Sequence, residues 1–107
     1  MKTFGQIIAE ARKALGLSQK DLAAKVRKED GESISPQYLN DIEHDRRNPP
    51  SGFIIEQLAK HLKLRPEPLI AAAGMWPEDL REKLPGADPE AVQKAFTAFR
   101  QTLKDKS

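Results

Sequence analysis

Four hydrogen-bonding side chains in the segment 35–48 are spaced so that they would share one face of a helix. They are Gln37, Asn40, Asp41 and His44, at positions i, i+3, i+4 and i+7. The amide of Gln37 can pair with adenine through two hydrogen bonds, and Asn40 can do the same where it reaches a base. The carboxylate of Asp41 can accept from the amino group of cytosine. The pattern therefore predicts a helix that reads base edges in the major groove of DNA.

Other residues around this helix suit contacts with the DNA backbone. Ser35 is placed as its N-cap, and Pro36 takes the first helical position, where a missing N–H costs nothing. Pro36 offers only apolar contact, for example to a thymine methyl group. Tyr38 could donate its hydroxyl to a phosphate or pack on the scaffold, and the sequence leaves both open. Arg46 and Arg47 follow the helix and suit phosphate or minor-groove contact.

The reading helix needs a scaffold, and the apolar residues around it predict one made of helices. Leu39 and Ile42 are expected to point into a core. Apolar residues three or four positions apart indicate further helices, and Ser18, with Asp21 three residues on, is close to a capping box. The expected helices cover residues 4–15 (capped by Thr3), 19–26, a segment from 36 that ends before 48, 53–62 and 66–73. No segment shows sustained strand alternation, so we predict an all-α fold.

The last third of the chain is predicted to form a helical extension. We expect a short helix from Pro77 to Leu84, with Trp76 as its apolar entry. A turn at residues 85–89 then leads into a last helix that begins at Pro89 and frays from Lys104 onward.

The apolar residues of this last helix lie on one side of it. They are Ala91, Val92, Ala95, Phe96, Phe99 and Leu103. Such a face is too apolar for a free, solvated helix. One interpretation is a dimerisation surface, with Trp76, Phe96, Phe99 and Leu103 as its residues. The alternative is packing against the helices at 53–62 and 66–73.

Composition narrows the class of protein. The 107 residues allow one compact domain plus an appendage. The absence of cysteine excludes disulfides and thiolate metal sites and favours a reducing cytoplasm. The sequence shows no signal-peptide layout, and no membrane span is expected from its apolar runs. Residues 1–65 carry 12 Lys and Arg against 9 Asp and Glu, whereas residues 66–107 carry 6 against 7. The basic excess therefore lies with the predicted reading helix.

A distinctive run precedes that helix: Leu17-Ser18-Gln19-Lys20-Asp21-Leu22-Ala23-Ala24-Lys25-Val26. Together with the cap at Ser35, the Ile42-Glu43 pair and the arginines before Asn48, it resembles the Cro/cI-type helix-turn-helix family, also called XRE-like regulators. The resemblance covers roughly residues 4–70. It implies a lambda-repressor-like bundle of about five helices that binds DNA sequence-specifically, usually as a dimer on a two-fold-symmetric operator. Residues 1–74 would form the DNA-binding domain and residues 75–107 the extension.

The resemblance also implies roles for residues outside the reading stripe. Gln19 matches a glutamine that grips a backbone phosphate, at a helix start whose free N–H groups also favour phosphate. Glu43 is expected to form a structural ion pair with Arg12. Lys20 is either close to DNA or a solvated charge on its helix. Where many members carry a hydrogen-bonding reader, this chain has Pro36.

The chain departs from the family pattern between its second and third expected helices. There, Arg27 to Ile34 make 8 residues, where a compact motif has about 3–4. The insertion is acidic around Glu29-Asp30-Gly31-Glu32 and would be repelled by phosphates. We predict that it bulges away from DNA, or that Arg27 and Lys28 offset its charge. If it changes the angle between the two helices instead, the predicted base contacts weaken first.

The leading functional prediction is a transcriptional regulator, most simply a repressor, that binds operator DNA without a cofactor and acts in the cytoplasm on the nucleoid. The alternative is an antitoxin-like or protease-regulated protein whose tail engages another polypeptide and whose DNA binding is autoregulatory. An enzyme is not predicted, because the chain has no Gly-rich phosphate loop, no cysteine nucleophile and no histidine–carboxylate set in separated elements. A metal site at Glu43-His44-Asp45 is not predicted either, since adjacent helical residues diverge around the axis.

Overall fold

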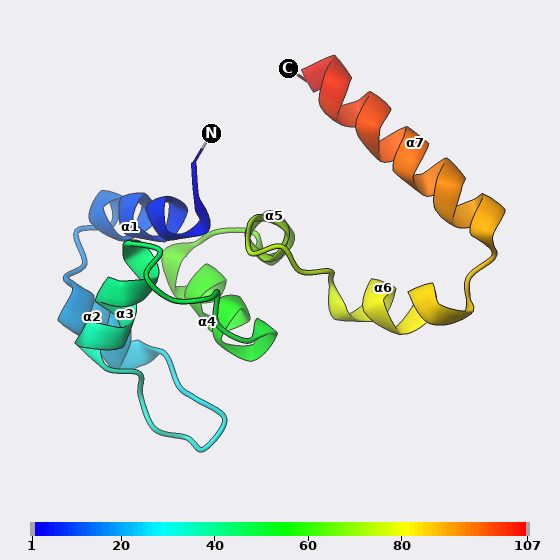
Figure 1. Cartoon of the computed structure of the whole chain (residues 1–107). Coiled ribbons are helices and arrows are strands. Elements are labelled where there is room, and N and C mark those ends of the chain that lie inside the picture. The colour runs from blue at the N-terminus through cyan, green and yellow to red at the C-terminus, as the bar shows by residue number, and fades with distance from the viewer. Residues whose placement is uncertain (1, 107) are drawn as a thin grey trace. The chain divides into compact units, whose positions relative to one another are not determined.

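The computed structural model describes residues 2–106, with the side chains of residues 2–104. Within this range the regular elements are helices, together with one isolated β-bridge between Arg27 and Ser33. Figure 1 shows α1 (Phe4–Ala14), α2 (Gln19–Lys25), α3 (Pro36–Glu43), α4 (Gly52–Leu62), α5 (Pro66–Ala72), α6 (Glu78–Lys83), the 3₁₀ turn η1 (Leu84–Gly86) and α7 (Pro89–Lys106). The prediction of an all-α fold is confirmed.

The chain divides into two compact units. The first runs to Met75 and holds α1 to α5, and the second begins at Trp76 and holds α6, η1 and α7. The sequence places the boundary after Gly74, one residue earlier. Of the helices in the described part of the chain, none is both long enough and apolar enough to cross a membrane.

Side-chain caps fix where α1, α2 and α3 begin. The Thr3 hydroxyl accepts from the backbone N–H of Gln6 at 3.1 Å, and the Gln6 side chain accepts from the Thr3 N–H at 2.9 Å. Ser18 and Asp21 form the same reciprocal arrangement at the start of α2, as the sequence predicts. Ser35 accepts from the N–H of Tyr38 at 3.0 Å and so starts α3. Each cap supplies a partner to an N–H that the first helical turn cannot satisfy.

The hydrophobic core lies where the first four helices meet α5. Its largest fully buried side chains are Ile8, Val26, Leu22, Leu39, Ile55 and Leu58. Leu39 and Ile42 are 0% and 2% exposed, so the prediction that they are core residues is confirmed. Because both lie on one edge of α3, the opposite edge of that helix faces outward.

The second unit differs from the sequence prediction at its helix ends. The short helix runs from Glu78 to Lys83 and continues as a 3₁₀ turn, rather than spanning Pro77 to Leu84. The last helix continues to Lys106, so the expected fraying from Lys104 is wrong across the described residues, and Ser107 lies outside them. Lysine is a good helix former, and its charge is favourable near a helix C-terminus.

Candidate nucleic-acid interface

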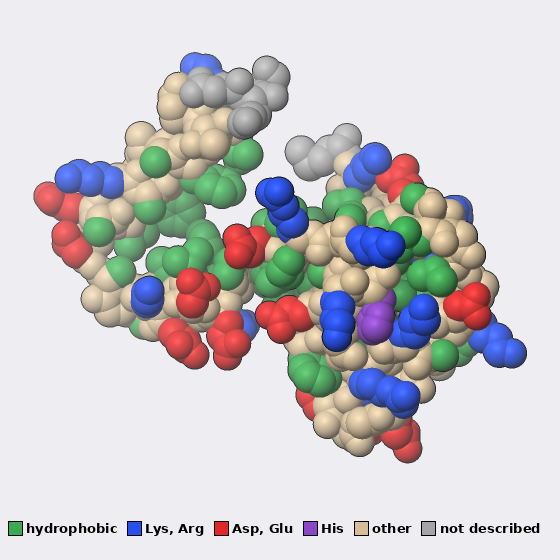
Figure 2. Space-filling model, turned by 180° about the vertical axis from the view of Figure 1, so that it is seen from behind, with side chains coloured by type: hydrophobic (Ala, Val, Ile, Leu, Met, Phe, Trp, Pro, Cys, Tyr) green, Lys and Arg blue, Asp and Glu red, His purple; other side chains and the backbone are tan. Residues whose placement is uncertain are grey.

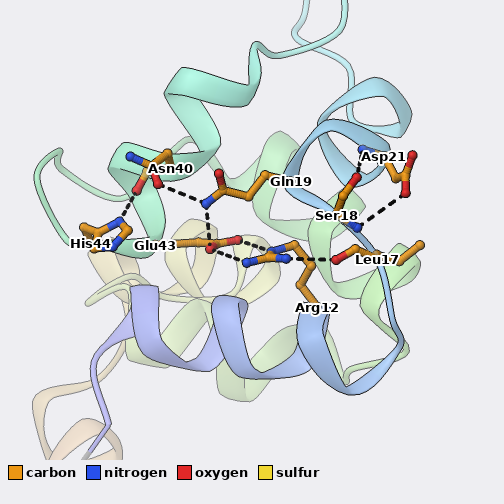
Figure 3. A network of polar contacts seen from close by, with 8 residues as sticks. All are labelled: Arg12, Leu17, Ser18, Gln19, Asp21, Asn40, Glu43 and His44. Carbon is orange, nitrogen blue, oxygen red and sulfur yellow. Dashed lines mark hydrogen bonds and ion pairs between the residues drawn. The ribbon is translucent and has the colours of Figure 1, made fainter.

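A buried ion pair anchors α3 to α1. The Arg12 guanidinium donates from Nε to Glu43 Oε2 at 2.7 Å and from Nη2 to Glu43 Oε1 at 3.0 Å. Its Nη1 donates to the backbone carbonyl of Leu17 at 2.8 Å, so the same side chain also ties down the turn before α2 (Figure 3). The hydrogen bond to Glu43 raises the pKa of Arg12 above its ordinary value. A pair held in this way fixes the α3 backbone relative to its scaffold.

Gln19 extends this network to the outer edge of α3. Its Nε2 donates to Glu43 Oε1 and to Asn40 Oδ1, both at 3.0 Å (Figure 3). Since a carboxylate can only accept, Glu43 fixes the Gln19 amide with its nitrogen inward. The atom of Asn40 that meets this nitrogen must then be an acceptor, which leaves the Asn40 amide nitrogen as the group able to donate outward. The Asn40 oxygen keeps a second lone pair, so pairing with adenine through two bonds is compatible with this contact.

Asp41 is at the centre of a second polar cluster on α3. Its Oδ1 accepts from Gln37 Nε2 at 3.0 Å, and its Oδ2 accepts from Arg47 Nε at 3.4 Å. Arg46 lies close by, with Nη1 3.9 Å from Oδ1. The sequence prediction that Asp41 reads a cytosine remains a prediction, but in this conformation its oxygen atoms bond to the protein.

Tyr38 and His44 have partners of their own. The Arg47 guanidinium lies over the Tyr38 ring at 5.1 Å from its centre, and Tyr38 is half-buried against the core. Of the two alternatives for Tyr38, the structure has the packing contact, and the phosphate contact stays untested. His44 is exposed, and its Nδ1 lies 2.8 Å from the Asn40 carbonyl. Within the described residues no group of histidines and carboxylates could hold a metal ion.

The remaining predicted contact residues lie around the edges of these clusters. Lys20 is exposed beside Gln19 at the start of α2, and Pro36 is exposed at the first position of α3. Arg46 and Arg47, which contact Asp41, are exposed in the loop that follows α3. The structure therefore joins Gln19 to Asn40 and Gln37 to Asp41 and Arg47, and leaves Lys20 and Pro36 outside both clusters.

Two residues that hold the segments before and after α3 were not recognised from the sequence. Asp45 adopts a left-handed backbone conformation (φ 55°) after α3, and its carboxylate accepts from the Gly5 N–H at 3.0 Å and from the Thr3 hydroxyl. This carboxylate binds the N-terminal end of α1, where the helix dipole favours a negative charge. Aspartate tolerates a left-handed conformation better than most residues, so its place after a helix end was an available signal.

The second is Gln57, which holds the base of the inserted loop. Its amide accepts from the Arg27 N–H at 2.7 Å and donates to the Arg27 carbonyl at 2.6 Å. Within the insertion, Arg27 and Ser33 form an antiparallel β-bridge, and the Lys28 N–H donates to the Glu32 carbonyl at 2.7 Å. The insertion is therefore a short hairpin. In Figure 1 it projects beyond the helices of its unit. Whether it avoids DNA remains a prediction.

Comparisons with known proteins identify the family and the fold of this chain. The helix-turn-helix family HTH_3 matches residues 8–69. A Bacillus subtilis (strain 168) protein, named uncharacterized HTH-type transcriptional regulator RghRB, is 36% identical over 108 residues, which cover 96% of this chain and 73% of that protein. A solved SinR protein/SinI protein complex contains a chain of the same fold, with a TM-score of 0.54 and 20% identity over 96% of this chain and 99% of that one. The chain therefore belongs to the XRE-like helix-turn-helix family of DNA-binding transcriptional regulators.

Proposed function

We propose that this protein is a repressor that binds a palindromic operator as a homodimer, with one α3 helix in each of two major-groove half-sites. The observation that carries the proposal is the division of α3 into two edges. Leu39, Ile42 and Glu43 are buried in the scaffold, whereas Gln37 is exposed and Asn40 half-exposed on the other side. A helix held along one edge and polar along the other suits the major groove.

In this proposal the polar residues divide into base readers and backbone contacts. Gln37 and Asn40 reach base edges, with His44 further along the same stripe. Gln19, Lys20, Ser35 and Tyr38 are placed for phosphate oxygens, and Pro36 for a thymine methyl group. Arg46 and Arg47 supply the charge that attracts the DNA backbone.

The second unit is proposed as the dimerisation element. Val92, Phe96, Phe99 and Leu103 on α7 follow the 4-3-4 spacing of a helix-pairing seam. Phe99 and Leu103 are 60% and 55% exposed, and Trp76 packs edge-on against Phe96 with the ring centres 5.6 Å apart. In Figure 2 hydrophobic side chains collect on the inner side of the angle between α6 and α7. Pairing two copies would cover this surface and set the half-site spacing.

Selection of bound duplexes from a random pool tests the proposal. We expect a palindromic consensus whose half-site centres lie about 10 base pairs apart. The reason is that the two α3 helices of a symmetric dimer would enter major grooves one helical turn apart. Binding should weaken steeply as salt rises. A pool that yields no sequence bound better than random duplex would overturn operator recognition, and a consensus without symmetry would overturn the dimer alone.

A second candidate function keeps DNA binding but gives the α7 surface to a different polypeptide. The observation that favours it is the shared fold with a chain of the SinR protein/SinI protein complex, which is an assembly between two proteins. By this proposal the chain is an antitoxin-like or protease-regulated partner. Sedimentation of the purified protein separates the two candidates: a dimer at micromolar concentration supports self-association, and a monomer supports a foreign partner.

A further inference from the structure

We propose that Asp41 restrains sequence-independent DNA binding by holding the two arginines after α3, and that it makes the protein selective without itself reading a base. The inference rests on the proposed docking of α3 in DNA. The carboxylate lies between Gln37 Nε2 (3.0 Å), Arg47 Nε (3.4 Å) and Arg46 Nη1 (3.9 Å). It thus accepts hydrogen bonds from Gln37 and Arg47 and forms an ion pair with Arg46, all three of which the proposed interface needs.

The Asp41 side chain is much less exposed to solvent than the two arginines it contacts. The Asp41 side chain is 17% exposed, while those of Arg46 and Arg47 are 62% and 57% exposed. Arg47 is held from two sides, because its guanidinium also lies over the Tyr38 ring at 5.1 Å. The positive charges are therefore at the surface, but their nearest anion is a shielded carboxylate of the same protein.

This arrangement acts differently on random and on matching DNA. Binding to random duplex depends almost entirely on phosphate contacts, and an arginine that leaves Asp41 for a phosphate leaves a carboxylate facing the DNA. That repulsion opposes every sequence-independent complex. On a matching site, base contacts add to the phosphate contacts, and Asp41 contributes to them because it fixes the Gln37 amide with its oxygen free to accept. Asp41 thus lowers the affinity for random DNA and supports reading by Gln37.

The test compares Asp41→Asn with Glu67→Gln in the full-length chain. Both changes remove one negative charge, but Glu67 lies on α5, outside the cluster. Affinities are measured at several salt concentrations for a random duplex and for the duplex selected by the wild type. For Asp41→Asn we expect the affinity for random duplex to rise about threefold to tenfold beyond the control, as expected for released surface ion pairs. The salt dependence should steepen by about one released ion or more, and the ratio of specific to random affinity should fall.

Two results would overturn the proposal. The first is a gain on random duplex no larger than that of Glu67→Gln. The second is unchanged random binding with a loss on the selected duplex confined to one base pair, which would make Asp41 a base reader. Arg47→Gln in both backgrounds gives a further readout: it should cost more random-duplex affinity when Asp41 is already Asn. The measurement on random duplex needs no operator, so it tests the role of Asp41 independently of sequence recognition. A wild type that prefers no sequence would instead contradict the proposed function.

Discussion

At the scale of single residues, Glu43 connects the scaffold to the outer, polar edge of α3. It accepts two hydrogen bonds from Arg12 and one from Gln19, and only 3% of its side chain is exposed. A buried pair of this kind contributes less to stability than its bonds suggest, since both charges lose water. Removing only one residue of the pair is costly, however, because the remaining charge stays buried without its partner.

Glu43→Gln should therefore lower the free energy of unfolding by about 3–5 kcal/mol. The Arg12 guanidinium cannot relieve the loss by giving up a proton, because arginine stays charged in proteins throughout the neutral range. Urea denaturation measures the change, and Glu56→Gln on the exposed side of α4 is the matched control, with an expected change within about 0.5 kcal/mol. Equal stability of the two variants would mean that the pair does not anchor α3.

At the scale of elements, α1 and the end of α3 approach too closely for any side chain between them. A Cβ added to Gly5 would lie 2.4 Å from the Ile42 carbonyl oxygen and 2.6 Å from that of Glu43. Both are backbone atoms at the end of α3, so neither can move without moving that helix. The contact explains why the Gly5 N–H can reach Asp45.

Gly5→Ala should destabilise the protein by about 1–3 kcal/mol, as overpacking does, although alanine is the better helix former by about 1 kcal/mol. Gly52→Ala is the control, because a Cβ there would meet only the Met75 Cε, at 4.0 Å. That change should be neutral or slightly stabilising. Thermal unfolding of the two variants gives the comparison, and a Gly5→Ala protein as stable as Gly52→Ala would exclude a tight α1–α3 contact.

Some features of these elements could be predicted from the sequence, and others could not. Caps and apolar spacing are local signals, so Ser18, Ser35 and the buried edge of α3 followed from them directly. The contacts between Gly5 and α3 and between Gln57 and Arg27 join residues about 30 or more positions apart. Neither a glycine nor a glutamine in the sequence indicates which distant residue it will contact. Likewise, the stripe on α3 indicated which side chains share a face, but not that Asp41 would take up Gln37 and Arg47.

At the scale of the whole molecule, the residues proposed to read bases and those proposed to pair two copies lie in different units of the chain. The proposed base contacts belong to α3, and the exposed apolar seam belongs to α7. An operator bound at two half-sites gains affinity from linking them, commonly by a factor of about 10²–10⁴. Loss of pairing should therefore reduce binding to the full operator while binding to an isolated half-site is retained.

Phe99→Glu tests this separation, because it places a charge in the middle of the seam, on a side chain that is 60% exposed. We expect a monomer in sedimentation and at least a tenfold loss on the full operator, with half-site affinity within about twofold of the wild type. Ala98→Glu adds the same charge to an exposed position one residue earlier, outside the apolar seam, and should leave the dimer intact. If Phe99→Glu remained dimeric and bound the operator normally, the seam would have another occupant, and the foreign-partner proposal would become the better account of α7.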